Sequence, residues 1–116
     1  KISVIAFMNT GCPDCRKELP EIEKAYQQFR DDESIRFIAI SRSQGYESLT
    51  DYWIKNAFTL PYSAQEDDFI FQKFASQNIP RIYIASPEGI IVFASDDSYI
   101  VTTEIIVEQI NGITGK

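Results

Sequence analysis

The chain contains two cysteines, and both lie in one four-residue segment, Cys12-Pro13-Asp14-Cys15. An apolar run, residues 2–8, comes just before this segment and is typical of a buried strand. Pro13 is favoured at the first position of a helix, so the strand is expected to turn almost directly into a helix. The sequence therefore predicts a strand–turn–helix unit with one cysteine at the helix N-terminus and the other one turn further on.

The position of Cys12 favours a reactive thiol. Unpaired backbone N–H groups and the macrodipole stabilise an anion at a helix N-terminus, and the thiolate is the nucleophilic form of cysteine. Cys15 lies within bridging distance of Cys12, because disulfides join Cα atoms roughly 4.4 to 6.8 Å apart. The spacing indicates redox chemistry, although a simple structural disulfide and half of a metal site share the same pattern.

Composition disfavours several other functions. A net charge of -6 argues against binding to nucleic acid or to an anionic membrane, since both rely on clustered Lys and Arg. Structural zinc usually needs four Cys or His ligands, whereas this chain has two cysteines and no histidine. We therefore expect no metal and no cofactor.

The length of the chain predicts one domain. With 116 residues, 44% of them hydrophobic, the chain can form one real core and is too short for two ordinary domains, so residues 1–116 are expected to be a single domain. No apolar run approaches the roughly 18 residues of a membrane span. The chain opens directly in a strand without an initiator methionine, which suggests that it was excised from a longer precursor.

Periodicity and turn residues predict the remaining elements. Apolar residues spaced by three and four predict that the first helix reaches about Arg30, with Pro20 inside it, where a proline should bend the axis. The later elements are a strand 35–40, a polar loop 41–45, a helix capped near Ser48 and reaching Ala57, a helix from Asp67 or Asp68 to near Asn78, a hairpin of strands 82–85 and 90–94, and a helix from Thr102 or Thr103 to Asn111-Gly112. The order β-α-β-α-α-β-β-α predicts an α/β fold, a central mixed four-stranded sheet with helices on both faces.

Four features in this order resemble the thioredoxin superfamily. They are the first strand, a CxxC pair at the mouth of a helix, Pro20 five residues after the second cysteine, and Ile79-Pro80 just before a late strand. The segment from Cys12 to Pro20 is most similar to extracytoplasmic thiol-disulfide oxidoreductases of the TlpA/ResA type. The resemblance covers nearly the whole chain and implies a thioredoxin-like fold.

The same resemblance implies a function. It indicates an enzyme that exchanges disulfides with protein substrates, more as a reductase than as an oxidase, in a periplasmic or membrane-tethered setting. A partner protein would then recycle the cysteine pair, and the domain itself is expected to be a monomer that does not contact the membrane. The alternative is a redox-inert thioredoxin-fold interaction module in which Cys12 and Cys15 form a static disulfide.

The resemblance assigns roles to the residues that match it. Cys12 becomes the exposed nucleophile and Cys15 the buried resolving thiol, roles that also follow from their positions on the helix. Pro80 matches the cis-proline of the family, which lies beside the cysteines and leaves neighbouring backbone free to bind an extended substrate. The expected substrate contacts are Gly11, Pro13, Ile79, Pro80 and Arg81. The open alternative for Pro80 is a trans proline that starts an edge strand, and for Arg81 a surface salt bridge.

Glu18 is the candidate proton carrier. It lies three residues after Cys15 on the same side of the helix, where a carboxyl group could have a raised pKa and exchange a proton with that thiol. TlpA/ResA-like proteins carry a glutamate at this position. The alternative is an exposed helix glutamate within reach of Asp14 or Lys17.

Three residues depart from patterns in related proteins. Gly11 stands where family members commonly have an aromatic residue, so the surface around Cys12 should be flatter. Ala6 stands where thioredoxins proper carry a buried acid, which leaves Glu18 as the best proton carrier. Asn9 stands where cysteine peroxidases typically have threonine, which disfavours a peroxidase. Trp53 is interpreted as a core residue.

Overall fold

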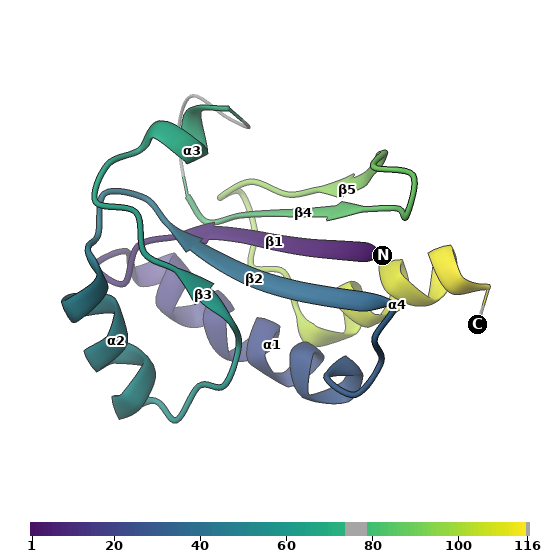
Figure 1. The fold of residues 1–116 in the computed structure, drawn as a ribbon, viewed down its shortest axis with the longest axis horizontal. Helices are drawn as coiled ribbons and strands as arrows, with labels where there is room; N and C mark the ends of the chain where they lie inside the picture. Colours follow the sequence, from purple (N-terminus) through teal and green to yellow (C-terminus); the bar gives the residue numbers. More distant parts are fainter. Residues whose placement is uncertain (74–78, 116) are drawn as a thin grey trace.

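The computed structural model describes residues 1–73 and 79–115 as a sheet flanked by helices (Figure 1). Its elements, in chain order, are β1 (Ile2–Met8), α1 (Pro13–Phe29), β2 (Ile35–Ser41), α2 (Tyr46–Lys55), β3 (Tyr62–Ser63), α3 (Phe69–Gln72), β4 (Arg81–Ala85), β5 (Ile91–Ala94) and α4 (Thr103–Thr114). In the part of the chain that is described, no helix is both long and apolar enough to cross a membrane.

The sheet is mixed, as predicted, but it has five strands in the order β3-β2-β1-β4-β5. Strand β1 pairs parallel with β2 and antiparallel with β4, and β4 pairs antiparallel with β5. The expectation of four strands is wrong because β3 adds a short edge in which Tyr62 pairs with Ala39 of β2. A strand of two residues is too short to produce a hydrophobic period, so the sequence pattern gives no sign of it.

Helices cover both faces of the sheet, which confirms the predicted α/β, thioredoxin-like architecture. Helices α1 and α4 lie behind the sheet in Figure 1, whereas α2 lies nearer the viewer. Thr103, the first residue of α4, donates its backbone N–H to Glu21 Oε1 and its hydroxyl to the Glu21 carbonyl, each at 3.0 Å. These bonds fix the start of α4 against the middle of α1.

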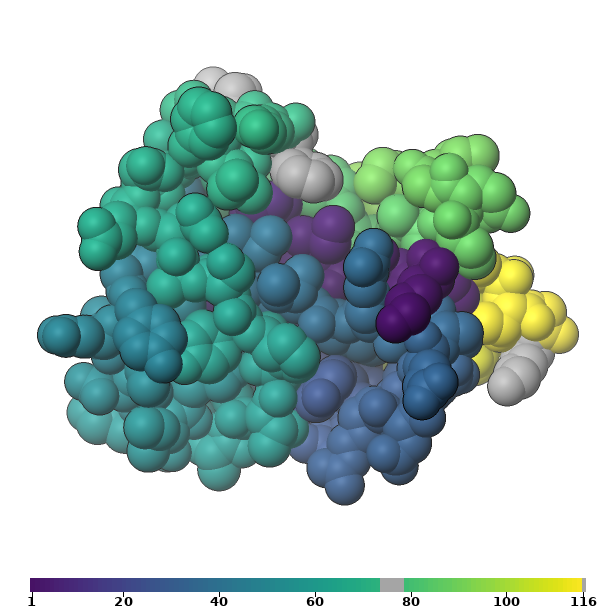
Figure 2. Space-filling model, in the orientation of Figure 1, coloured from purple at the N-terminus to yellow at the C-terminus, as the bar shows by residue number. Residues whose placement is uncertain are grey.

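The buried core contains residues of the sheet, of helices α1 and α4, and of helices α2 and α3. Burial alternates along β2, where Ile35, Phe37 and Ala39 are buried and the residues between them are more exposed, as expected for a strand with one covered face. On the nearer side of the sheet, β1 and β2 reach the surface between the α2–β3 segment and the β4–β5 hairpin (Figure 2). Trp53 is buried and donates its indole N–H to the Leu60 carbonyl at 2.7 Å, which confirms that it is a core residue.

Helix boundaries differ from the expected ones at the start of α2 and at the end of α4. Helix α2 begins at Tyr46 after Gly45 rather than after Ser48, because the Ser48 hydroxyl accepts a hydrogen bond from Gln44 instead of capping the helix. Helix α4 continues past Asn111-Gly112 and ends at Thr114. Its C-cap is Gly115, whose φ of 78° suits a residue without a side chain. The expected end of the third helix, near Asn78, lies outside the described residues.

Candidate active site

Cys12 is the N-cap residue of α1. Its sulfur accepts a hydrogen bond from the Cys15 backbone N–H at 3.5 Å, and its carbonyl accepts the first helical bond, from the Arg16 N–H, at 3.1 Å. The side chain is half-buried, and its thiol contacts the Ile79 carbonyl oxygen at 3.8 Å. The helix N-terminus therefore presents backbone N–H groups to a sulfur that a substrate can still reach.

Cys15 lies one turn further along α1 and is fully buried. Burial is the main reason that the pKa of its thiol is raised far above the ordinary value. The Cys12 side chain and the negative charge of Glu18 raise it further, whereas a hydrogen bond with the Asn9 backbone acts in the opposite direction. The two thiols are unbonded, so the structure represents the reduced form of the pair.

Glu18 is buried in α1, not exposed on its surface. Its side chain is 1% exposed, and its Oε2 atom accepts the Val101 backbone N–H at 3.0 Å. The pKa of this carboxyl is raised to about 7, mainly by burial. The Val101 hydrogen bond acts to lower the pKa, and the negative charge of Asp14 acts to raise it. The other carboxyl oxygen, Oε1, is buried without a hydrogen-bond partner among the described residues.

Two acidic groups of unequal strength, the Cys15 thiol and the Glu18 carboxyl, lie on one buried face of α1. Ionisation of Glu18 raises the pKa of Cys15, so a second negative charge in this setting is costly. If a proton moves from the Cys15 thiol to the Glu18 carboxylate, the pair still carries only one negative charge. The partnerless Oε1 atom leaves one oxygen available for that proton.

The Ile79-Pro80 loop lies against Cys12 although it is 67 residues away in sequence. Antiparallel pairing of β1 with β4 places Arg81, the first residue of β4, opposite Phe7, near the end of β1. The Ile79–Pro80 peptide bond is cis, the form that the family resemblance implies, and both residues are buried. Pro13, next to Cys12 on α1, is exposed.

Asn9 holds the loop before Cys12 in place. Its carbonyl accepts the Cys12 N–H at 3.0 Å, its Oδ1 atom accepts the Gly11 N–H at 2.8 Å, and its Nδ2 group donates to the Arg42 carbonyl at 2.9 Å. A Cβ atom added at Gly11 would lie 3.2 Å from Asn9 Oδ1. An aromatic residue at this position would therefore require Asn9 to shift, which gives a physical reason for the glycine.

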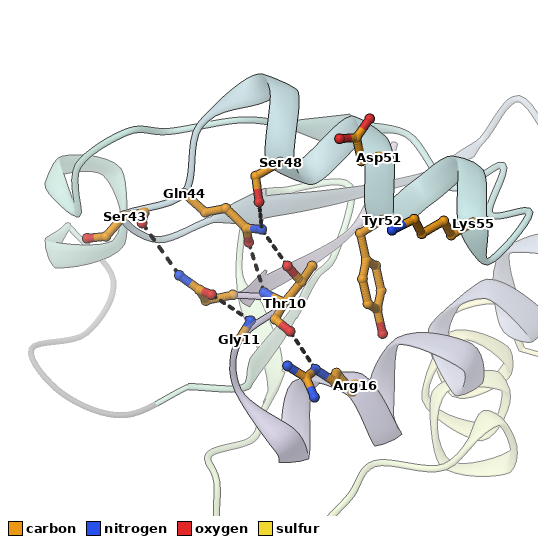
Figure 3. Close-up of a pocket in the computed structure, with 10 residues that line it drawn as sticks. Thr10, Gly11, Arg16, Ser43, Gln44, Ser48, Asp51, Tyr52 and Lys55 are labelled. Carbon is orange, nitrogen blue, oxygen red and sulfur yellow. Dashed lines mark hydrogen bonds between the residues drawn. The ribbon is translucent and has the colours of Figure 1, made fainter.

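Gln44 is a site residue that sequence reasoning missed (Figure 3). It is 8% exposed, and its Oε1 atom accepts the Thr10 N–H at 2.8 Å. Its amide nitrogen donates to the Thr10 hydroxyl and, at 2.9 Å, to the Ser48 hydroxyl. The sequence indicates only a polar loop here, because a single glutamine that reaches across to another loop leaves no periodic signal.

A mixed sheet, a CxxC pair at a helix N-terminus and a cis-proline loop against the first cysteine define this chain as a thioredoxin-fold protein of the thioredoxin superfamily. A family model described as the AhpC/TSA family matches residues 1–94, so the chain belongs to that family. No curated protein matches the sequence.

Solved structures share this fold over nearly the whole chain. StoA from Bacillus subtilis is 21% identical with a TM-score of 0.80, covering 93% of this chain and 81% of that one. A candidate protein disulfide isomerase from Bacteroides thetaiotaomicron is 27% identical with a TM-score of 0.90, covering 100% of this chain and 75% of that one. A secreted thiol-disulfide isomerase from Corynebacterium glutamicum is 11% identical with a TM-score of 0.85, covering 100% and 72%.

Proposed function

We propose that this single domain is a protein thiol-disulfide oxidoreductase that uses Cys12 and Cys15 as its redox pair and acts mainly as a reductase. The observation that carries the proposal is the unequal setting of the two sulfurs, one half-buried at a helix N-terminus and the other fully buried behind it. The disulfide isomerases among the similar structures support the same reaction class. A static disulfide would need no such asymmetry.

The reaction proceeds by two thiol-disulfide exchanges. The Cys12 thiolate attacks one sulfur of the substrate disulfide, forming a mixed disulfide and releasing the other substrate sulfur as a thiolate that takes up a proton. Cys15 then loses its proton and attacks the Cys12 sulfur, which releases the second substrate thiolate. The substrate gains two electrons and two protons, and the chain is left with a Cys12–Cys15 disulfide that a dithiol partner protein must reduce.

Glu18 acts in the second exchange as a general base. Cys15 is a weak acid because burial raises its pKa, so it needs a nearby acceptor to become a thiolate. The Glu18 carboxyl, with a pKa of about 7, is present in both protonation states near neutral pH and suits that task. In the reverse direction the protonated carboxyl would return the proton to the leaving Cys15 sulfur.

The substrate is proposed to bind as an extended segment across Cys12 and the Ile79-Pro80 loop. Gly11 and Pro13 are exposed on either side of Cys12, and Arg81 follows Pro80 at the start of β4. We propose that the domain acts as a monomer. We also propose that it acts outside the cytoplasm, because a similar structure from Corynebacterium glutamicum is that of a secreted protein.

Alkylation of the reduced chain tests this proposal. We expect iodoacetamide at neutral pH to modify Cys12 at least about tenfold faster than Cys15, because only Cys12 is accessible at a helix N-terminus. Mass spectrometry of quenched samples measures both rates, and the urea-unfolded chain, in which the two rates should converge, is the control. Equal, slow modification of both thiols in the folded chain would favour the redox-inert module. A titration of the pair against glutathione then gives the direction of electron flow.

A further inference from the structure

A polar hollow of about 750 Å³ opens beside the active-site loop, between the N-terminus of α1 and helix α2 (Figure 3). Gly11, the residue before Cys12, lines it, so no side chain separates the nucleophile from the hollow at this position. Arg16 of α1 and Tyr52 and Lys55 of α2 line it as well. The hollow therefore lies where a polypeptide joined to Cys12 by a mixed disulfide can extend.

Arg16 is anchored within this hollow. Its Nε–H donates to the Thr10 carbonyl at 2.6 Å, and Thr10 is itself held by Gln44. In residues 1–73 and 79–115, its two terminal guanidinium nitrogens make no hydrogen bond or ion pair. The bond to Thr10 restrains the side chain, so less conformational entropy is lost when the free nitrogens bind a ligand.

Two cations, Arg16 and Lys55, and one anion, Asp51, line the hollow, although the chain as a whole carries -6. Figure 3 shows the Lys55 amine turned back toward Tyr52 and the Asp51 carboxylate directed away from Arg16. Within the described residues, none of Arg16, Asp51 or Lys55 takes part in a salt bridge. Two unpaired cations, one of them a planar guanidinium, suit a carboxylate.

We propose that this hollow binds an acidic side chain of the protein substrate close to its reactive disulfide. The inference rests on the proposed function and adds a substrate preference to it. Arg16 and Lys55 supply the charge, and the Tyr52 side chain lies between them in the wall of the hollow. Because the chain has a net charge of -6, a local cationic site would also orient an acidic substrate on Cys12.

Two disulfide peptides that differ only in the residues beside their cysteines test the inference. Each is a short intramolecular disulfide, with either glutamate or glutamine at the residues flanking its cysteines. We expect the wild-type chain to reduce the glutamate peptide about five to ten times faster, in kcat/KM at low salt, and the ratio to fall as salt is added. Arg16→Gln and Lys55→Gln should each lower the ratio, and the double variant should bring it close to one.

Lys17→Gln is the matched control, because Lys17 is an exposed cation next to Arg16 that does not line the hollow. It should keep the wild-type ratio, whereas an equal loss in this control would reduce the effect to general surface charge and overturn the proposal. Oxidised glutathione is the third substrate. If Arg16→Gln slows the reduction of glutathione as much as that of the glutamate peptide, the hollow binds a small disulfide that carries carboxylates. The proposal that it binds an acidic side chain of a protein substrate would then be wrong.

The peptides also separate this inference from the function on which it rests. If the wild-type chain reduces both peptides at equal rates, disulfide exchange stands and the acidic-substrate site is overturned. If it reduces neither, the proposed function fails and the substrate preference falls with it.

Discussion

A chain with serine in place of Cys12 is expected to lose insulin reduction by about three orders of magnitude or more. The hydroxyl of serine is un-ionised at neutral pH and is a poor nucleophile toward sulfur, and Cys15 is fully buried behind position 12. The measurement is the turbidity of insulin reduced with dithiothreitol as electron donor, with the uncatalysed rate subtracted.

Cys15→Ser is the companion variant, because it removes the resolving thiol and leaves Cys12 in place. It should also lose turnover, but after reaction with an oxidised peptide it should accumulate a covalent adduct at Cys12, detectable by intact mass. Both variants remove one sulfur, so they are matched in chemistry and differ in which step they stop. Turnover that survives Cys12→Ser, or an adduct located on Cys15 of the wild-type chain, would contradict the assigned roles.

The two cysteines could be predicted from sequence because their chemistry is local. Pro13 fixes the start of α1, and three residues of helix then place Cys15 one turn below Cys12. The same reasoning places Glu18 on the face of Cys15, since side chains three residues apart are neighbours on a helix. Within one helix, the spacing of residues in the sequence determines the relative positions of their side chains.

Contacts between distant segments could not be predicted in this way. Val101, whose N–H bonds to Glu18, is 83 residues further along the chain, and the loop that places it there has no regular period. Gln44 and Thr10 are 34 residues apart and meet only because β1 and β2 are parallel neighbours in the sheet. The sequence therefore indicates the candidate reacting groups, and the pairing of strands determines their hydrogen-bond partners and their burial.

Glu18→Gln is expected to remove a pH-dependent loss of stability. The pKa of the carboxyl rises from its ordinary value of 4.5 to about 7 in the folded chain. Below pH 4.5 the group is neutral in both states and nothing is lost. Between these pKa values the unfolded chain ionises first, so stability falls as the pH rises, by on the order of 3 kcal/mol in total once the folded carboxyl is also ionised. Glutamine does not titrate, and the fall should disappear.

Urea unfolding of the reduced chain at a series of pH values from 4 to 8 measures this difference. Glu21→Gln on the same helix is the control, because its carboxylate accepts hydrogen bonds from Thr103 that lower its pKa. That variant should have the opposite signature, with the lost stability appearing above the ordinary carboxyl pKa and vanishing as the pH falls. A wild-type profile that is unchanged by Glu18→Gln would mean that Glu18 titrates as an ordinary surface acid.

The same Glu18 variant should slow the second exchange step without slowing the first. Glutamine can still accept the Val101 N–H but cannot take a proton from Cys15, so resolution of a mixed disulfide formed at Cys12 loses its base. We expect a decrease of about a hundredfold at neutral pH, which should diminish as the pH is raised and hydroxide takes over deprotonation. Rapid-quench mass spectrometry of the mixed disulfide measures both steps. Equal slowing of both, or an unchanged resolution rate across pH, would restrict Glu18 to a structural role in holding Val101.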